Sequence, residues 1–262
     1  MKIATWNVNG IKARIDQLKG WLESTRPDVV CLQEIKSVDE GFPASEIEAL
    51  GYNVAVHGQK SFNGVGILSL APLEDITRGL PGEDDDSQAR FIEAVIALPG
   101  SALRVAAIYL PNGNPIGTDK FAYKCRWMDR LERHMRDRLM LEECFIIAGD
   151  FNIIPEPADA ARPQAWTEDA LFQPESRAAW RRYLALGLTD AVRTCHPGPG
   201  VYSFWDYQAG AWQKNNGIRI DHLLLSPQAA DVVVSAGVDK GPRGAEKPSD
   251  HTPVWVELDI AT

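Results

Sequence analysis

Polar side chains that can bind a metal ion or carry a proton stand at four points where an apolar run of the sequence ends or begins. They are Asn7 after the first run, Glu34 after the second, Asp150 and Asn152 after a later one, and Asp250 and His251 before the last. Side chains at the ends of neighbouring strands often meet at the rim of one pocket. We therefore expect these residues to form a single site.

Such a set has the components that hydrolysis of a phosphodiester requires: a positive centre, a base that activates water, and donors for the charge on the phosphoryl oxygens. Glu34 offers hard anionic oxygens to Mg²⁺, and Asn7 offers a neutral oxygen. Asp150 is the candidate general base, and Asn152 can donate an amide N–H to a phosphate oxygen. His251 is a second donor if a carboxylate keeps it protonated, because the reference pKa of histidine is roughly 6.5.

Each of these signals is weak when taken alone. A glutamate at the end of a strand is usually a surface charge, and an Asp-Xaa-Asn sequence is usually a turn. The prediction depends on the ordered set, which comprises Gln33-Glu34, Gly149-Asp150-Phe151-Asn152, Arg219-Ile220-Asp221-His222 and Ser249-Asp250-His251. These segments follow one another over most of the chain.

The elements that must position these residues are short strands and a few helices. Runs rich in β-branched residues predict strands at Ile3–Trp6, Val29–Leu32, Val54–Val56, Val65–Leu70, Phe91–Leu98, Leu103–Tyr109, Phe145–Ala148, Ile220–Leu225 and Val254–Leu258. Helical periodicity is clearest from about Asp119 to Met140, where one apolar stripe should face a sheet. The other side of this helix, which we expect to face solvent, carries Lys124, Arg130, Arg133 and Arg136.

No interdomain linker and no solenoid repeat divide the chain. The sequence therefore predicts one α/β domain, residues 1–262, with long loops at 81–88, 155–175, 196–200 and 241–249.

The formal net charge is −9 at pH 7, which argues against general adhesion to nucleic acid, because a net acidic body repels phosphate. Part of this charge can belong to a metal site, where a divalent cation offsets it. A DNA substrate is therefore not excluded, but its contacts must be local. We expect a basic strip formed by Lys12, Arg14, Lys60 and Arg90.

The cysteines lack the paired spacing of a zinc site and the density of a secreted disulfide scaffold; they are Cys31, Cys125, Cys144 and Cys195. The N-terminal segment turns polar before the apolar core of a signal peptide can form, and no later apolar run is long enough to cross a bilayer. These features predict a cytoplasmic protein with reduced cysteines and no membrane contact. We expect it to be a monomer.

Several segments resemble the exonuclease III branch of the exonuclease/endonuclease/phosphatase superfamily. The similarity runs from Lys2 to about Leu258 and is most specific at Trp6–Arg14, Pro27–Glu34, Leu50–Val54 and Glu246–His251. It implies an α/β fold of the DNase I-like type, a four-layer sandwich of two facing β-sheets flanked by helices. It also implies a DNA-repair phosphodiesterase that uses Mg²⁺, with Mn²⁺ as a substitute. Such an enzyme cleaves double-stranded DNA 5′ of abasic sites and trims blocked 3′ ends, as a 3′→5′ exonuclease and 3′-phosphatase.

Carried over position by position, the resemblance assigns the magnesium site to Asn7, Glu34, Asp150, Asn152 and Asp250. The catalytic group that it implies consists of Tyr109, a phenol near the phosphate, Asp150, Asn152, and the pair Asp221 and His251, in which Asp221 fixes the orientation and charge of the histidine. Asn9 matches the bacterial exonuclease III enzymes, whereas animal abasic endonucleases tend to carry Asp at this position.

The segment Tyr202–Tyr207 resembles the aromatic loop that meets the damaged nucleotide in this family. The candidate substrate contacts are Phe204, Trp205 and Trp212, with the basic residues Lys12, Arg14 and Arg90. A pocket lined by these rings would admit a base-less sugar and exclude an intact nucleotide, or stack on an exposed base. Alternating aromatic residues fill a core equally often, so both interpretations stay open. Ile218 and Gln208 replace the Trp and Met of some relatives, which leaves the details of lesion recognition open as well.

Other functions of this superfamily share the catalytic set. A phosphoesterase of the inositol-phosphate or sphingomyelin type usually differs around Trp6–Gly10 and Tyr202–Tyr207, and a non-specific nuclease would lack the lesion pocket. A non-catalytic scaffold that binds nucleic acid would have lost polar positions that are all occupied here.

Overall fold

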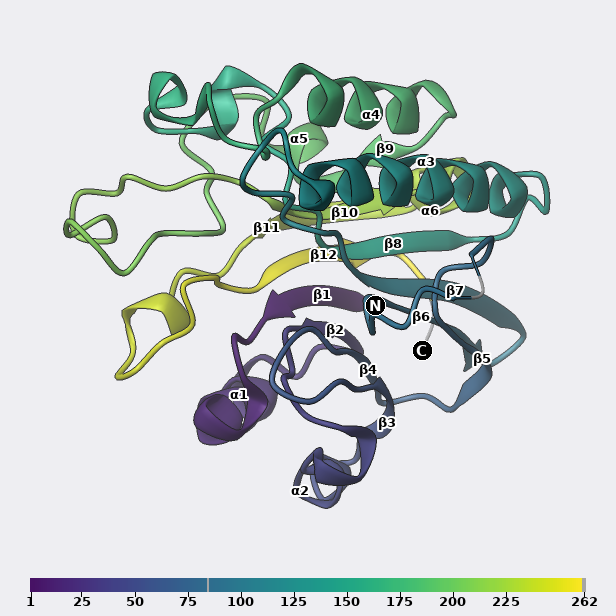
Figure 1. Cartoon of the computed structure of the whole chain (residues 1–262). Helices are drawn as coiled ribbons and strands as arrows, with labels where there is room; N and C mark the ends of the chain where they lie inside the picture. Colours follow the sequence, from purple (N-terminus) through teal and green to yellow (C-terminus); the bar gives the residue numbers. More distant parts are fainter. Residues whose placement is uncertain (84, 261–262) are drawn as a thin grey trace.

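Two six-stranded β-sheets pack face to face in the computed structural model, which describes residues 1–83 and 85–260 (Figure 1). The first sheet has the strand order β11-β12-β1-β2-β4-β3 and consists of β1 (Lys2–Asn7), β2 (Val29–Gln33), β3 (Asn53–His57), β4 (Val65–Ser69), β11 (Val233–Val238) and β12 (Val254–Leu258). The second has the order β5-β6-β7-β8-β10-β9 and consists of β5 (Leu73–Arg78), β6 (Phe91–Leu98), β7 (Ser101–Tyr109), β8 (Phe145–Asp150), β9 (Thr189–Asp190) and β10 (Asp221–Leu225).

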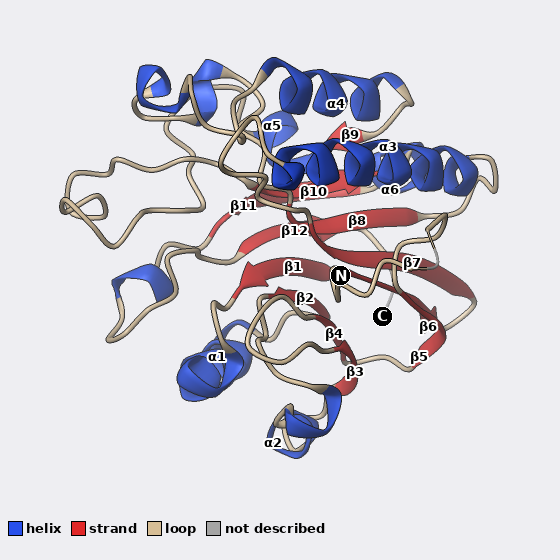
Figure 2. Ribbon diagram, in the orientation of Figure 1, coloured by secondary structure: helices blue, strands red, loops and turns tan. Residues whose placement is uncertain are grey.

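Helices cover the outer faces of both sheets, which gives four layers (Figure 2). The first sheet packs on α1 (Ile11–Thr25) and α2 (Ala44–Glu48), and the second packs on α3 (Asp119–Leu139) and α4 (Pro174–Ala185). Two short helices, α5 (Ala191–Cys195) and α6 (Pro227–Ala230), lie close to β10. The four-layer sandwich expected from the resemblance is confirmed.

The strands at the centre of each sheet are buried on both faces. In β2, Cys31 contributes to the core between the sheets, whereas Leu32 contributes to the core beneath α1. In β8, Ile146 likewise contributes to the core between the sheets, whereas Ile147 contributes to the core beneath α3. This burial explains why these strands are continuous apolar runs in the sequence rather than alternating patterns.

All nine predicted runs form strands, with ends that differ by a few residues. The three strands that sequence reasoning missed are β5, β9 and β11, and each lies at an edge of its sheet. An edge strand buries less of its surface, as the exposed residues of β5 show, so its sequence carries a weaker apolar pattern.

The prediction that one side of α3 faces solvent is wrong for Lys124 and Arg130, whose side chains are buried. Lys124 lies three and four positions before Trp127 and Met128, on the stripe that packs on the sheet. Arg130 is paired with the carboxylates of Glu83 and Asp86. The prediction holds for Arg133 and Arg136, which are exposed.

Within the described residues, no helix combines the length and the apolar character that crossing a membrane requires.

Candidate active site

The topology brings the predicted polar residues to one end of the sandwich. Strands β1 and β2 are parallel, and Asn7 pairs with Gln33, so Asn7 and Glu34 leave the first sheet side by side. In the second sheet β7 and β8 are also parallel, and Tyr109 pairs with Asp150. The carboxyl ends of parallel strands share one edge of a sheet, which is where ligand sites of such sheets form.

The remaining residues reach the same end through antiparallel partners. Asp221, the first residue of β10, pairs with Asp150. His251 lies just before β12, which runs antiparallel to β1. The close approach of β7 and β8 requires Gly149, because a Cβ atom at this position would lie 2.0 Å from the carbonyl oxygen of Ile108.

Asn7 joins the two sheets at the site. Its Nδ2 donates to Glu34 Oε1 at 2.9 Å and to Asp150 Oδ2 at 3.0 Å, and its Oδ1 accepts from the backbone N–H of Asn9 at 3.0 Å. The amide therefore turns its N–H groups towards the two carboxylates. Its predicted role as an oxygen ligand would require the amide to rotate.

The two carboxylates differ in their electrostatic surroundings. Burial raises the pKa of Glu34, but the hydrogen bond from Asn7 and the ammonium of Lys36, 2.9 Å from Oε2, lower it below its ordinary value. Burial, with the nearby charges of Asp221 and Glu34, raises the pKa of Asp150 to about 7, although His251 lowers it. Asp150 is thus a buried carboxylate whose charge is only partly compensated.

His251 lies between two aspartates. Its Nδ1 is 2.8 Å from Asp221 Oδ2, and its Nε2 is 3.7 Å from Asp150 Oδ2. Burial lowers the pKa of His251, but the charges of Asp221 and Asp150 raise it more strongly, to about 10. The imidazole is therefore protonated at neutral pH and directs Nε2 towards Asp150. Ser203 donates to the same Asp221 oxygen at 2.6 Å and so holds the carboxylate in place.

Asn152 has a left-handed backbone, with φ 47°, and its polar atoms are extensively bonded. Its N–H donates to Asp150 Oδ1 at 2.9 Å and its Nδ2 donates to Leu110 O at 2.8 Å. Its Oδ1 accepts from Asn112 at 3.2 Å. Because an amide nitrogen has two N–H groups, one remains for a substrate oxygen.

Tyr109 is partly exposed at the end of β7, and the guanidinium of Arg90 lies over its ring at 4.8 Å from the centroid. Burial and the charges of Glu34 and Asp150 raise its pKa well above the ordinary value, so the phenol keeps its proton and is a hydrogen-bond donor.

Asp250 is displaced from the other carboxylates. Its Oδ1 accepts from Asn9 Nδ2 at 3.0 Å, and Asn9 Oδ1 accepts from Lys36 Nζ at 2.5 Å. Asp250 therefore connects to Glu34 through Asn9 and Lys36 rather than by direct contact. Sequence reasoning assigned no role to Lys36 or Ser203, and only their places near Glu34 and before Phe204 hinted at one.

The donor set fits a hard divalent cation. Atoms of Glu34, Asp150 and His251 lie within 4.8 Å of one another. The protonated His251 is not a ligand, so the carboxylates of Glu34 and Asp150 are the groups available to a cation. A cation would also supply the compensation that Asp150 lacks, and oxygen donors favour Mg²⁺ or Mn²⁺ over zinc.

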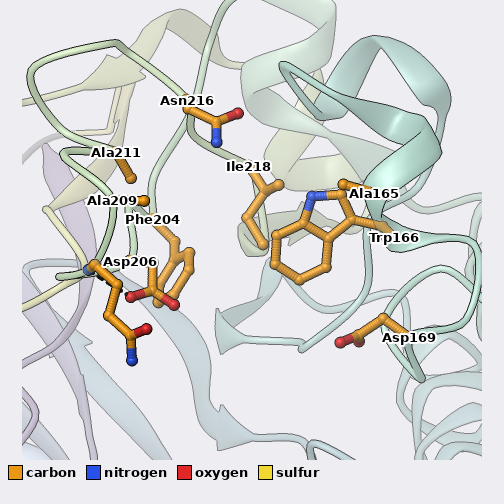
Figure 3. A pocket seen from close by; sticks show the side chains of 10 residues that line it. Ala165, Trp166, Asp169, Phe204, Asp206, Ala209, Ala211, Asn216 and Ile218 are labelled. Carbon is orange, nitrogen blue, oxygen red and sulfur yellow. Dashed lines mark hydrogen bonds between the residues drawn. The ribbon is translucent and has the colours of Figure 1, made fainter.

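A cavity of about 340 Å³ opens beside this site (Figure 3). Phe204 and Trp166 lie on opposite sides of it with Ile218 between them in this view, and Asp169, Ala209 and Asn216 also line it. The ring of Phe204 is 5.0 Å from that of His251, which joins the cavity to the charged residues. Sequence reasoning missed Trp166, because it stands in a 155–175 loop without any periodic pattern.

The other predicted substrate contacts are placed differently. Trp205 is fully buried, and its indole N–H is bonded to Asn215, so it supports the loop and presents no surface to a substrate. Trp212 is partly exposed and packs on Trp205 at 4.9 Å between ring centroids. Lys12 and Lys60 are exposed on the surface. Arg14 donates to Asn9 O at 2.5 Å at the rim of the site.

A family model and the sequence of a known protein each match most of the chain. Residues 4–251 match the model of the Endonuclease/Exonuclease/phosphatase family. The chain is 36% identical to exodeoxyribonuclease III of Haemophilus influenzae, over 98% of this chain and all of the relative.

Solved structures agree with this relationship. The 3′-5′ exonuclease NExo of Neisseria meningitidis is 37% identical over 99% of this chain and all of its own, with a TM-score of 0.94. NExo has also been solved as a 3′ phosphatase bound to a product DNA hairpin. An AP endonuclease from Archaeoglobus fulgidus is 36% identical over 99% of this chain and all of its own, with a TM-score of 0.93.

Proposed function

The chain belongs to the endonuclease/exonuclease/phosphatase family, and from that premise we propose that it is a DNA-repair phosphodiesterase of the exonuclease III type. It cleaves duplex DNA 5′ of abasic sites and removes blocked 3′ ends, with Mg²⁺ as its cofactor and Mn²⁺ as a substitute. The observation that carries this proposal is the pair formed by Asp150 and the protonated His251, 3.7 Å apart, beside a cavity lined by Phe204, Trp166 and Ile218 together with polar side chains.

Each side chain has one role in this proposal. Asp150 accepts the proton of the attacking water. His251 donates from Nε2 to a phosphate oxygen, and Asp221 keeps it oriented and charged. Asn152 and Tyr109 are the other two donors. Glu34 and Asp150 would hold the cation, which supplies positive charge against the phosphate when bound.

The cavity beside Phe204 is the proposed lesion pocket. An abasic nucleotide costs little to expose because it has no base to unstack. Its bare sugar can enter the cavity between Phe204 and Trp166. A pocket of this kind selects the lesion without general attraction to DNA, which agrees with a net charge of −9. We also propose that local basic residues, among them Lys12, Arg14 and Arg90, contact the phosphates.

The test uses labelled duplexes with one abasic analogue, with a 3′-phosphate, or without damage, each with and without Mg²⁺. We expect a single cut 5′ of the abasic site that leaves an end a polymerase can extend, release of the 3′-phosphate, and loss of both activities in EDTA. Equal nicking of the undamaged duplex would point to a non-specific nuclease. Hydrolysis of inositol polyphosphate instead of DNA would assign the chain to another branch of the family.

The pocket can be tested separately by Phe204→Ala and Trp166→Ala. Both variants should weaken the preference for abasic over undamaged duplex and leave removal of a terminal 3′-phosphate less affected. Unchanged lesion preference in both variants would remove the cavity from the proposal.

A further inference from the structure

Lys124 is a buried lysine that the proposed reaction does not use directly. It lies on α3 with a side chain that is 0% exposed, and its Nζ donates to the carbonyl oxygens of Asn152 at 2.6 Å and Asn112 at 3.1 Å. These two carbonyls belong to different loops, one after β8 and the other after β7. A single amine therefore joins the two loops that flank the site.

The loop after β7 packs closely against the aliphatic part of the Lys124 side chain. Gly113 has φ 88°, and a Cβ atom there would lie 2.6 Å from Lys124 Cδ. Any larger residue would force Lys124 or the loop to shift. The contact is thus built by close packing as well as by hydrogen bonds.

Lys124 completes the set of hydrogen bonds that holds Asn152. Its N–H, its Nδ2 and its Oδ1 bond to Asp150, Leu110 and Asn112, and Lys124 supplies the partner for its carbonyl oxygen. Asn112 in turn is held by the second hydrogen bond from Lys124. Removing the amine would leave the carbonyl of Asn152 without its donor and would free both loops to shift.

We propose that Lys124 is a positioning residue, which holds the loops of Asn152 and Asn112 together so that the amide of Asn152 meets the substrate phosphate. This inference rests on the proposed phosphodiesterase function. It does not depend on the charge of the lysine. Burial lowers the pKa of Lys124 to about 7, but even the neutral amine has two N–H groups, enough for both carbonyls.

The experiment is a double-mutant cycle between Lys124→Met and Asn152→Ala, measured as single-turnover cleavage of an abasic duplex at saturating protein. Lys124→Met fills the same space without donors. It should lower the rate by about 10–100-fold, as loss of a supporting contact in an active site typically does, with DNA affinity little changed. In the Asn152→Ala background the same substitution should cost much less, because the amide that it positions is already absent.

Arg133→Met is the matched control, since it removes a positive charge from an exposed position of the same helix and should keep the wild-type rate. Thermal melting checks that each variant is folded. If Lys124→Met does not fold, Lys124→Leu, which also lacks donors, takes its place in the cycle.

An equal fold-loss in both backgrounds would overturn the inference, because it would show a structural effect independent of Asn152. A wild-type rate in Lys124→Met would overturn it as well. A wild-type protein that fails to cleave the abasic duplex would instead overturn the proposed function, and this inference with it.

Discussion

Glu93 on β6 and Asp150 on β8 are both buried carboxylates of the second sheet, but their surroundings are opposite. Glu93 contacts two guanidinium groups and an imidazole: Arg104 at 3.2 Å, Arg138 at 2.5 Å and His134 at 2.7 Å. Burial raises its pKa, but these partners lower it below the ordinary value.

Asp150 has His251 as its nearest cation, at 3.7 Å, and shares its surroundings with Asp221 and Glu34. Its pKa is raised, mainly by burial, to about 7. The comparison separates two uses of a buried charge. At Glu93 the protein's own side chains compensate the carboxylate charge, and their contacts tie β6 to α3. At Asp150 the protein compensates the carboxylate charge only in part, so that a bound cation can complete the compensation. A metal-dependent active site requires such a carboxylate.

The largest difference should appear when each carboxylate becomes an amide. Asp150→Asn removes the proposed base and one cation ligand, so turnover on an abasic duplex should fall by at least about 10²–10⁴-fold. The melting temperature without metal should not fall, because a poorly compensated buried charge has been removed. Steady-state kinetics and calorimetry measure the two effects. Activity within tenfold of wild type would show that Asp150 is not the base.

Glu93→Gln should have the opposite effect, a loss of stability without a loss of turnover. It leaves Arg104, Arg138 and His134 without their shared carboxylate and should lower the free energy of unfolding by about 3 kcal/mol. This is the lower end for a broken buried pair, because Arg138 is partly exposed. Turnover per folded molecule should be preserved. Denaturant unfolding measured beside kinetics tests this, and a loss of turnover without a loss of stability would contradict the structural role.

Added Mg²⁺ should stabilise the folded protein through the site of Asp150 and Glu34, and Glu93 should play no part in this effect. At roughly 100 times its dissociation constant a bound ion contributes about 2.7 kcal/mol, provided that it binds only the folded state. Wild type and Glu93→Gln should both gain this increment, and Asp150→Asn and Glu34→Gln should gain less. Equal gains in all four proteins would place the ion elsewhere.

The smallest effect should be a change in pH dependence. His251 has a pKa raised to about 10, so it stays protonated until the pH rises through that value. Asp221→Asn removes the strongest interaction that raises this pKa, so the alkaline limb of the rate profile should move to lower pH. Near pH 9 the rate should fall about twofold if the pKa drops by one unit and about tenfold if it drops by two, with less change on the acid side. A profile of unchanged shape would mean that the pair does not control protonation.

The sequence predicted much of the site because the relevant residues follow strands that are strongly apolar. Glu34 comes directly after such a strand and Asp150 is the last residue of another, so their positions could be inferred before the sheets were known. The edge strands β5, β9 and β11 could not be inferred in the same way, because exposure weakens the apolar pattern. Trp166 and Ser203 were missed because irregular loops have no periodicity to interpret.

The sequence by itself determined the central strands, the helix α3 and the set of polar residues, since burial imposes a pattern on each segment that is visible locally. Only the tertiary structure decided which buried polar side chains have a compensating partner and which do not. Lys124 and Trp205 are fully buried although their residue types suited solvent or substrate. The pKa values of Asp150 and His251 likewise depend on groups from different strands, because desolvation and charge act through space and not along the chain.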